Sequence, residues 1–155
     1  GESLELSQQD TLVLLVNERY KIPENLYIDH NVFQLASSNM IAPDIRIYSA
    51  EGSTPTLRVQ FYTQEEKPVY DNMDFNWNYK NDTLRFDNYI KLAGQWRAQR
   101  VTLTLYLPEN KKVLLPSQTS QYLRNLRDFD RGVRSRLNKD KILLIMQDGK
   151  LQPLM

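Results

Sequence analysis

Four carboxylates that are close together in the sequence could support hydrolysis of a glycan. They are Glu65, Glu66, Asp71 and Asp74. A glycosidase holds two carboxyl groups about 5 to 9 Å apart across the scissile bond, and Tyr70, Phe75 and Trp77 could stack on a sugar ring. The alternative is a polar loop followed by a strand that carries Asp74 on its outer face. Because no spacing here is diagnostic of a glycosidase, we expect no enzymatic activity.

Other reactive side chains are few. The chain has no cysteine, which excludes disulfides, thiol nucleophiles and thiolate metal sites. Its one histidine, His30, follows Asp29; the pair could be a base with its orienting partner, but an isolated imidazole favours a surface residue. Asp71, Asn72 and Asp74 could ligate calcium, yet they lack the glycine turn and the distal glutamate of an EF-hand loop. We therefore expect no metal ion and no cofactor.

A stripe of arginines is the candidate partner-binding site. Its members are Arg124, Arg127, Arg131 and Arg134. On the opposite face, Tyr122, Leu126, Phe129 and Val133 recur at intervals of four, three and four residues, which predicts an amphipathic helix that begins near Ser117. Such a stripe could bind an acidic partner or anionic lipid. The alternative is a solvated helix face, because arginine is common on the outer side of a helix.

Length and charge narrow the class of protein. A chain of 155 residues suits one domain, and its longest apolar runs, Leu12 to Val16 and Ile142 to Met146, are too short to span a bilayer. Residues 1–80 hold six basic and twelve acidic side chains, a net charge of −6, whereas residues 81–155 hold fourteen and seven, a net charge of +7. A sequence pI of about 8.1 and the lack of a known module argue against nucleic-acid binding.

Apolar and polar residues alternate with a period of two in several segments, which predicts β-strands. These strands would position the candidate side chains. The alternating apolar series are Ile45 and Ile47; Leu57, Val59 and Phe61; Met73, Phe75, Trp77 and Tyr79; Leu84 and Phe86; and Val101, Leu103, Leu105 and Leu107. Between them lie polar residues and turn signals. Asn81-Asp82 predicts a hairpin turn, and Asp148-Gly149 predicts a second one that joins Ile142–Met146 to Leu151. An all-β sandwich or solenoid follows from short strands at this spacing.

The stretch from Trp77 to Pro116 carries a family pattern. The pattern consists of an aromatic strand, a short polar turn and a Leu-x-Phe/Leu-Asp-x-Tyr/Phe segment. Trp-Arg-x-Gln, a Val-x-Leu-Tyr-Leu-Pro strand and a Val-x-Leu strand follow. The matching residues are Tyr79, Leu84, Phe86, Asp87, Asn88, Tyr89, Trp96, Arg97, Ala98, Gln99, Val101, Leu103, Leu105, Tyr106, Leu107, Pro108, Val113 and Leu115. This pattern resembles the C-terminal toast-rack domain of phage shock protein C (PspC)-domain proteins from Bacteroidetes, which is related to adhesin-like β-solenoid domains.

The resemblance implies an all-β, toast-rack or β-solenoid-like stack of short strands, with one helix near the C-terminus. We expect residues 1–155 to form a single soluble domain, with N-terminal strands in 1–40, core strands in 41–116, and a helix and closing hairpin in 117–155. The chain opens at Gly1 without an initiator methionine, which we interpret as the start of an excised segment whose membrane anchor lies elsewhere in the parent.

The resemblance also implies a role without catalysis. In such proteins the soluble domain follows membrane spans in the inner membrane, so we expect the cell envelope, on the periplasmic side, as the location. The implied function is envelope-stress sensing or signalling through binding to an envelope or membrane protein. The alternative is a surface adhesin or glycan-binding domain that uses Tyr70, Phe75 and Trp77. The partner and the oligomeric state do not follow from the sequence.

Overall fold

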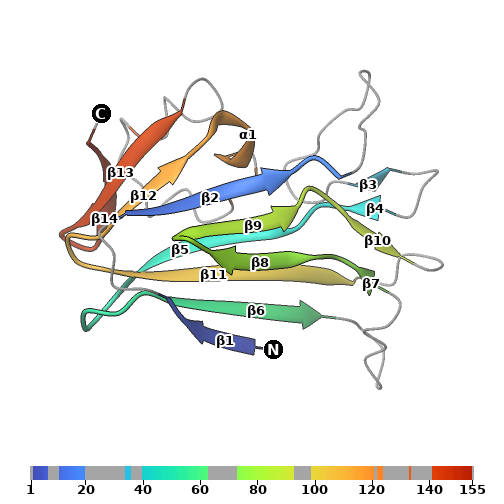
Figure 1. Ribbon diagram of the computed structural model, residues 1–155, viewed down its shortest axis with the longest axis horizontal. Helices are drawn as coiled ribbons and strands as arrows, with labels where there is room; N and C mark the ends of the chain where they lie inside the picture. The colour runs from blue at the N-terminus through green and yellow to red at the C-terminus, as the bar shows by residue number, and fades with distance from the viewer. Residues whose placement is uncertain are drawn as a thin grey trace.

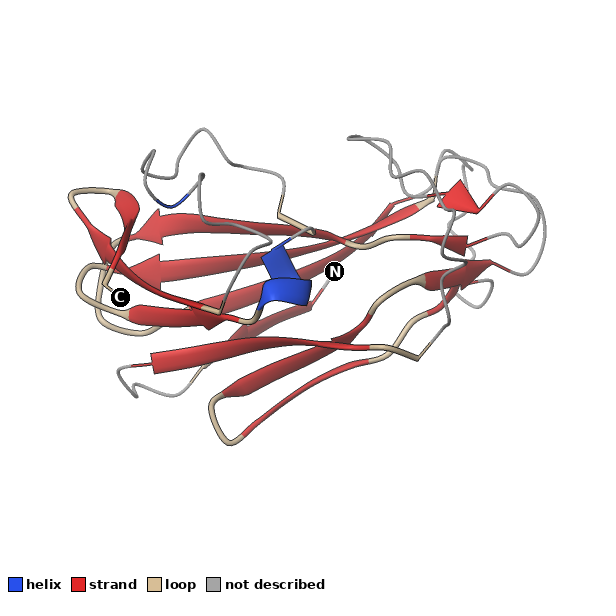
Figure 2. Ribbon diagram, turned by 90° about the horizontal axis from the view of Figure 1, so that it is seen from above, coloured by secondary structure: helices blue, strands red, loops and turns tan. Residues whose placement is uncertain are grey.

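The alternating segments form strands in the computed structural model, which describes residues 2–6, 11–19, 34–35, 40–62, 73–92, 99–120, 122–123, 133 and 141–154. The strands of this described part belong to three sheets. Figure 1 shows most of them running along the long axis of the molecule, and Figure 2 shows them from above as stacked layers. An all-β fold with stacked sheets agrees with the toast-rack prediction.

One four-stranded sheet has the order β1–β6–β11–β5. Its strands are Glu2–Glu5 (β1), Thr56–Tyr62 (β6), Arg100–Pro108 (β11) and Asp44–Ala50 (β5). β11 is antiparallel to β6 and parallel to β5. The apolar series of β11, which begins at Val101, points into the core, so Thr102, Thr104 and Tyr106 point to the outer face of the sheet.

A six-stranded sheet has the order β14–β13–β12–β2–β9–β8. Its strands are Lys150–Pro153 (β14), Ile142–Gln147 (β13), Lys112–Leu115 (β12), Thr11–Asn17 (β2), Thr83–Asp87 (β9) and Trp77–Lys80 (β8). β2 is parallel to both of its neighbours, β12 and β9. Buried side chains of this sheet and of the first four-stranded sheet form one hydrophobic cluster, so the two sheets share a core.

The third sheet is small and has the order β3–β4–β10–β7. Its strands are Gln34–Leu35 (β3), Met40–Ile41 (β4), Ile90–Leu92 (β10) and Met73–Asp74 (β7). Figure 1 shows it at the opposite end of the molecule from β13 and β14. The alternating series from Met73 to Tyr79 therefore does not form one strand, since it divides at Phe75 and Asn76 between two sheets.

Both predicted hairpins are present. Asn81 and Asp82 connect β8 to β9 with φ angles of 53° and 58°, and Asp148 and Gly149 connect β13 to β14 with φ angles of 55° and 75°. Positive φ at both central residues is the conformation of a two-residue type I′ turn, whose twist matches that of the strands.

The predicted C-terminal helix is not found in the described residues. The helical turn α1 covers only Ser117–Ser120, and the carbonyl oxygen of Tyr122 accepts a 2.9 Å hydrogen bond from the backbone nitrogen of Ile45. Leu123 forms a parallel bridge with Ile45. The backbone at this point thus pairs with β5, which a continuous helix would prevent because its carbonyls bond within the helix. Tyr122 and Leu123 are buried, so at these two residues pairing with β5 takes the place of the predicted helix.

We expect the domain to lose stability more steeply above pH 10 with Tyr89 than without it. Burial raises the pKa of Tyr89 above its ordinary value of 10.0. The folded state then keeps a proton that the unfolded chain releases, so this contribution is intact below pH 10 and is lost as the pH rises through the folded pKa. Urea unfolding of the wild type and Tyr89→Phe between pH 8 and 11 checks this, and equal slopes would contradict it.

Candidate functional site

The outer face of the sheet β1–β6–β11–β5 collects arginines and tyrosines. Strand register sets them side by side: Tyr106 of β11 lies beside Tyr48 of β5, and Arg100 lies beside Tyr62 of β6. Thr104 is paired with Arg46 on β5. Each of these residues alternates with an apolar residue that points into the core, so core packing fixes the direction in which it projects.

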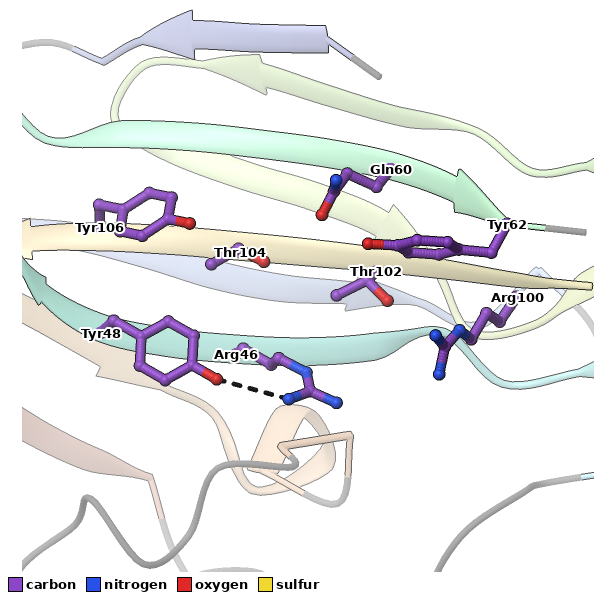
Figure 3. Close-up of a pocket in the computed structure, with 8 residues that line it drawn as sticks. All are labelled: Arg46, Tyr48, Gln60, Tyr62, Arg100, Thr102, Thr104 and Tyr106. Atoms are coloured by element: carbon purple, nitrogen blue, oxygen red, sulfur yellow. Dashed lines mark hydrogen bonds between the residues drawn. The ribbon is translucent and has the colours of Figure 1, made fainter.

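A pocket of about 300 Å³ lies on this face (Figure 3). Its lining residues are Arg46, Tyr48, Gln60, Tyr62, Arg100, Thr102, Thr104 and Tyr106. Thr102 and Thr104 belong to the central strand and are 6% and 5% exposed, so they form the floor between the longer side chains of β5 and β6. We call this set of eight residues the Arg–Tyr pocket.

Arg46 is held by the neighbouring tyrosine. Its Nη1 donates a 3.4 Å hydrogen bond to the hydroxyl oxygen of Tyr48. This bond is the main cause that raises the pKa of Arg46, while burial acts in the opposite direction and the charge of Asp44 adds a smaller raising effect. The guanidinium of Arg46 is therefore charged at neutral pH.

Aromatic contacts hold the other large side chains. The guanidinium carbon of Arg100 lies 4.6 Å from the centroid of the Tyr62 ring, which is a cation–π contact. The rings of Tyr48 and Tyr106 are tilted by 32°, with centroids 6.3 Å apart. Figure 3 shows both guanidinium groups on the same side of β11, toward β5. Two cations thus reach one border of the pocket in prearranged positions.

The charge of the pocket is positive. None of its eight lining residues carries a carboxylate. Asp44 is on the same face two residues before Arg46, but it does not line the pocket. Within the described part of the chain, the ion pairs both belong to Arg19. Neither Arg46 nor Arg100 forms an ion pair there, although the charge of Asp44 acts on Arg46. This arrangement suits a negatively charged ligand.

The groups in the pocket can bind a ligand through hydrogen bonds. Guanidinium, phenol, hydroxyl and amide groups can donate and accept hydrogen bonds, but the lining offers no carboxylate or imidazole as a base. Among the described residues, no three histidine, aspartate or glutamate side chains are placed to hold a metal ion.

Asp74, which we considered as a catalytic or calcium-binding carboxylate, belongs to an ion-pair cluster instead. Its two carboxylate oxygens accept hydrogen bonds of 2.9 and 2.8 Å from Arg19. Arg19 also donates a 2.9 Å bond to Asp87, whose Oδ2 accepts a second bond of 2.8 Å from the backbone nitrogen of Asn76. The cluster ties the residues after β2 to β7 and β9.

Two of the aromatic residues of the predicted glycan site are described, and both belong to the core or its border. Phe75 is buried in the core, and Trp77 packs against that core. The other residues that we considered for catalysis, calcium or glycan binding lie outside the described residues. They are Asp29, His30, Glu65, Glu66, Tyr70, Asp71 and Asn72.

The predicted partner-binding arginines Arg124, Arg127, Arg131 and Arg134 also lie outside the described residues. The residues of the Arg–Tyr pocket were not singled out from the sequence. Their signal was nevertheless present, because they are the polar members of the alternating series in β5, β6 and β11. What the series lacked was the register that brings the three strands together.

A family model described as ToastRack found in some PspC matches residues 24–153, which is more than half of the chain. No curated protein and no solved structure matches the chain significantly. In the described residues, no helix has the length and apolar character that crossing a bilayer requires. The match includes β5, β6 and β11, and with them the whole Arg–Tyr pocket.

Proposed function

The chain belongs to the toast-rack family found in some PspC proteins, and from this membership we propose that it is a protein-interaction or sensing domain of a membrane-anchored, phage-shock-type envelope protein. Toast-rack domains are generally non-enzymatic, and the pocket offers groups that can bind a ligand. The association with PspC suggests that the domain is one part of a membrane-anchored protein. We propose the periplasmic side as its location.

The observation that carries the proposal is the composition of the outer sheet face. Three tyrosines and two arginines line one pocket. Tyrosine and arginine are enriched in protein interfaces and in the few positions that dominate binding energy. Their rings and guanidinium groups are already fixed by contacts to one another, so less side-chain entropy is lost on binding. We therefore place the partner-binding site on this face.

Glycan binding, as in a surface adhesin, is the second candidate function. It is favoured by the polar floor of the pocket, where Thr102, Thr104 and Gln60 could bond to sugar hydroxyls. In this form the function differs from the one that the sequence suggested, because it relies on Tyr48 and Tyr106 rather than on Tyr70, Phe75 and Trp77.

The test is in-cell crosslinking and capture with the full-length parent protein. We expect the wild type to capture a specific envelope protein. The captured amount should fall at least tenfold when Tyr48 and Tyr106 are both replaced by serine, because an interface tyrosine that dominates binding contributes about 2 kcal/mol or more. Arg85→Ala, an exposed change on β9 of the other large sheet, is the control and should leave capture unchanged.

A second bait separates the two candidate surfaces. It carries glutamate at Arg124, Arg127, Arg131 and Arg134. Loss of capture with this bait alone would place the partner on the arginine stripe rather than on the sheet face. If no bait captures an envelope protein, the interaction proposal fails, and saturable quenching of tryptophan fluorescence by soluble envelope glycans would then favour glycan binding.

A further inference from the structure

The two arginines of the Arg–Tyr pocket differ in their contacts from the other described arginines. Arg19 has two carboxylate partners, and Arg58 and Arg85 are exposed to solvent, as Arg100 is. Arg46 and Arg100 instead contact tyrosines within the pocket, and no carboxylate lines it. Arginine binds carboxylates through a planar fork of donors. Carboxylates supplied by a ligand would give both guanidinium groups an ionic partner.

The pocket is extended along the sheet. Its lining residues on β11 run from Arg100 to Tyr106, which is about 20 Å of strand at 3.3 Å per residue. Arg100 and Tyr62 lie at one end, and Tyr48 and Tyr106 lie toward the other (Figure 3). A single small anion would use only one part of this length, whereas an extended segment of about six residues would match it.

The ring contacts favour a peptide over a sugar. A glycan stacks on the open face of an aromatic ring, but the guanidinium of Arg100 already covers one face of Tyr62. The rings of Tyr48 and Tyr106 are tilted against each other. Their edges and hydroxyl groups suit the alkyl stems and backbone of a peptide, and a tyrosine presents such mixed contact area with little loss of entropy.

We propose that the Arg–Tyr pocket binds an extended acidic segment of a partner protein, with carboxylates of that segment held by Arg46 and Arg100. The inference rests on the proposed interaction function, and it specifies the chemistry of the partner. Thr102, Thr104 and Gln60 bond to the segment between its acidic residues, and the paired tyrosines cover its far end. Attraction between the pocket and the segment weakens with salt, because exposed charges are screened within about 10 Å at 0.1 M ionic strength.

The experiment uses the purified chain and a fluorescein-labelled octaglutamate peptide as the probe, with fluorescence anisotropy as the readout. We expect saturable binding at low salt that weakens as salt is added. Arg46→Ala and Arg100→Ala should each weaken binding about tenfold, the effect of losing one charge-assisted hydrogen bond. Arg46→Lys should cause an intermediate loss, because it keeps the charge and removes the fork.

Arg85→Ala is the matched control, since it removes the same charge from the outer face of the other large sheet. Thermal unfolding of each variant shows that the fold is retained. An equal loss of affinity for Arg85→Ala would overturn the proposal, because binding would then follow net charge alone. No measurable binding would overturn it as well, and so would tighter binding of oligogalacturonate with the same dependence on Arg46 and Arg100.

The two proposals fail separately. Capture of an envelope protein through Tyr48 and Tyr106 without octaglutamate binding would keep the interaction function and reject the acidic segment. Octaglutamate binding through Arg46 and Arg100 without any captured partner would keep the acidic specificity of the pocket and reject the proposed partner interaction in the envelope.

Discussion

Replacing Phe86 with alanine is expected to lower the free energy of unfolding by about 3 to 5 kcal/mol. The Phe86 side chain is 0% exposed and belongs to the shared core of the two large sheets. Its ring meets that of Tyr122 edge to face, with centroids 5.9 Å apart and planes at 88°. Alanine removes this contact and leaves a cavity. Because a domain of this size is stable by about 5 to 15 kcal/mol, the variant would unfold at far lower denaturant concentrations.

Unfolding by guanidinium chloride, followed by tryptophan fluorescence, measures this loss of stability. Phe86→Leu keeps much of the volume and should cost clearly less than the alanine variant. Arg85→Ala is the neighbouring control on the opposite, exposed face of β9, and it should change stability by less than about 0.5 kcal/mol. A loss below 1 kcal/mol for Phe86→Ala would show that Phe86 and Tyr122 do not pack as the structure has them.

Local signals predicted most of the strands and both tight turns. The series from Val101 to Leu107 forms β11, with its apolar members buried. Asn81 and Asp82 turn between β8 and β9 as their tolerance of positive φ predicted. These features depend on a few neighbouring residues, so the sequence carries them without knowledge of the rest of the chain.

Non-local pairing explains where the predictions failed. The helical spacing that begins near Ser117 is real in the sequence, but Leu123 forms a bridge with Ile45, which lies far away along the chain. Such a contact is part of the tertiary structure, and local helix propensity does not predict it. The series from Met73 to Tyr79 looked continuous for the same reason, because only the partners β10 and β9 reveal that it contributes to two sheets.

The Arg–Tyr pocket shows what sequence reasoning lacked. Arg46, Gln60 and Thr102 each occur at a predictable outward position of a strand. They become one site because β11 lies between β5 and β6, with Thr102 opposite Gln60 and Thr104 opposite Arg46. The alternation gives the face on which a residue lies, and only the strand order gives its neighbours. A strand order that includes a parallel pair does not follow from short-range turn signals.

The ion-pair cluster around Arg19 leads to the second large effect. One guanidinium contacts two carboxylates that differ in burial: the side chain of Asp87 is 4% exposed, and that of Asp74 is 49% exposed. Arg19→Met should lower the free energy of unfolding by about 3 kcal/mol, because it leaves the carboxylate of Asp87 buried without its cation. Asp74→Ala removes an exposed partner of the same arginine and should cost less than about 1 kcal/mol.

The double variant Arg19→Met with Asp87→Asn separates buried charge from packing. Asparagine can still accept the 2.8 Å hydrogen bond from the backbone nitrogen of Asn76, and no uncompensated buried charge remains, because Asp74 is exposed. Urea unfolding should therefore show the double variant to be more stable than Arg19→Met alone, since a neutral pair avoids the cost of burying an unpaired ion. If the double variant is as unstable as Arg19→Met, or if Asp74→Ala costs as much, burial of Asp87 is not what gives this cluster its effect on stability.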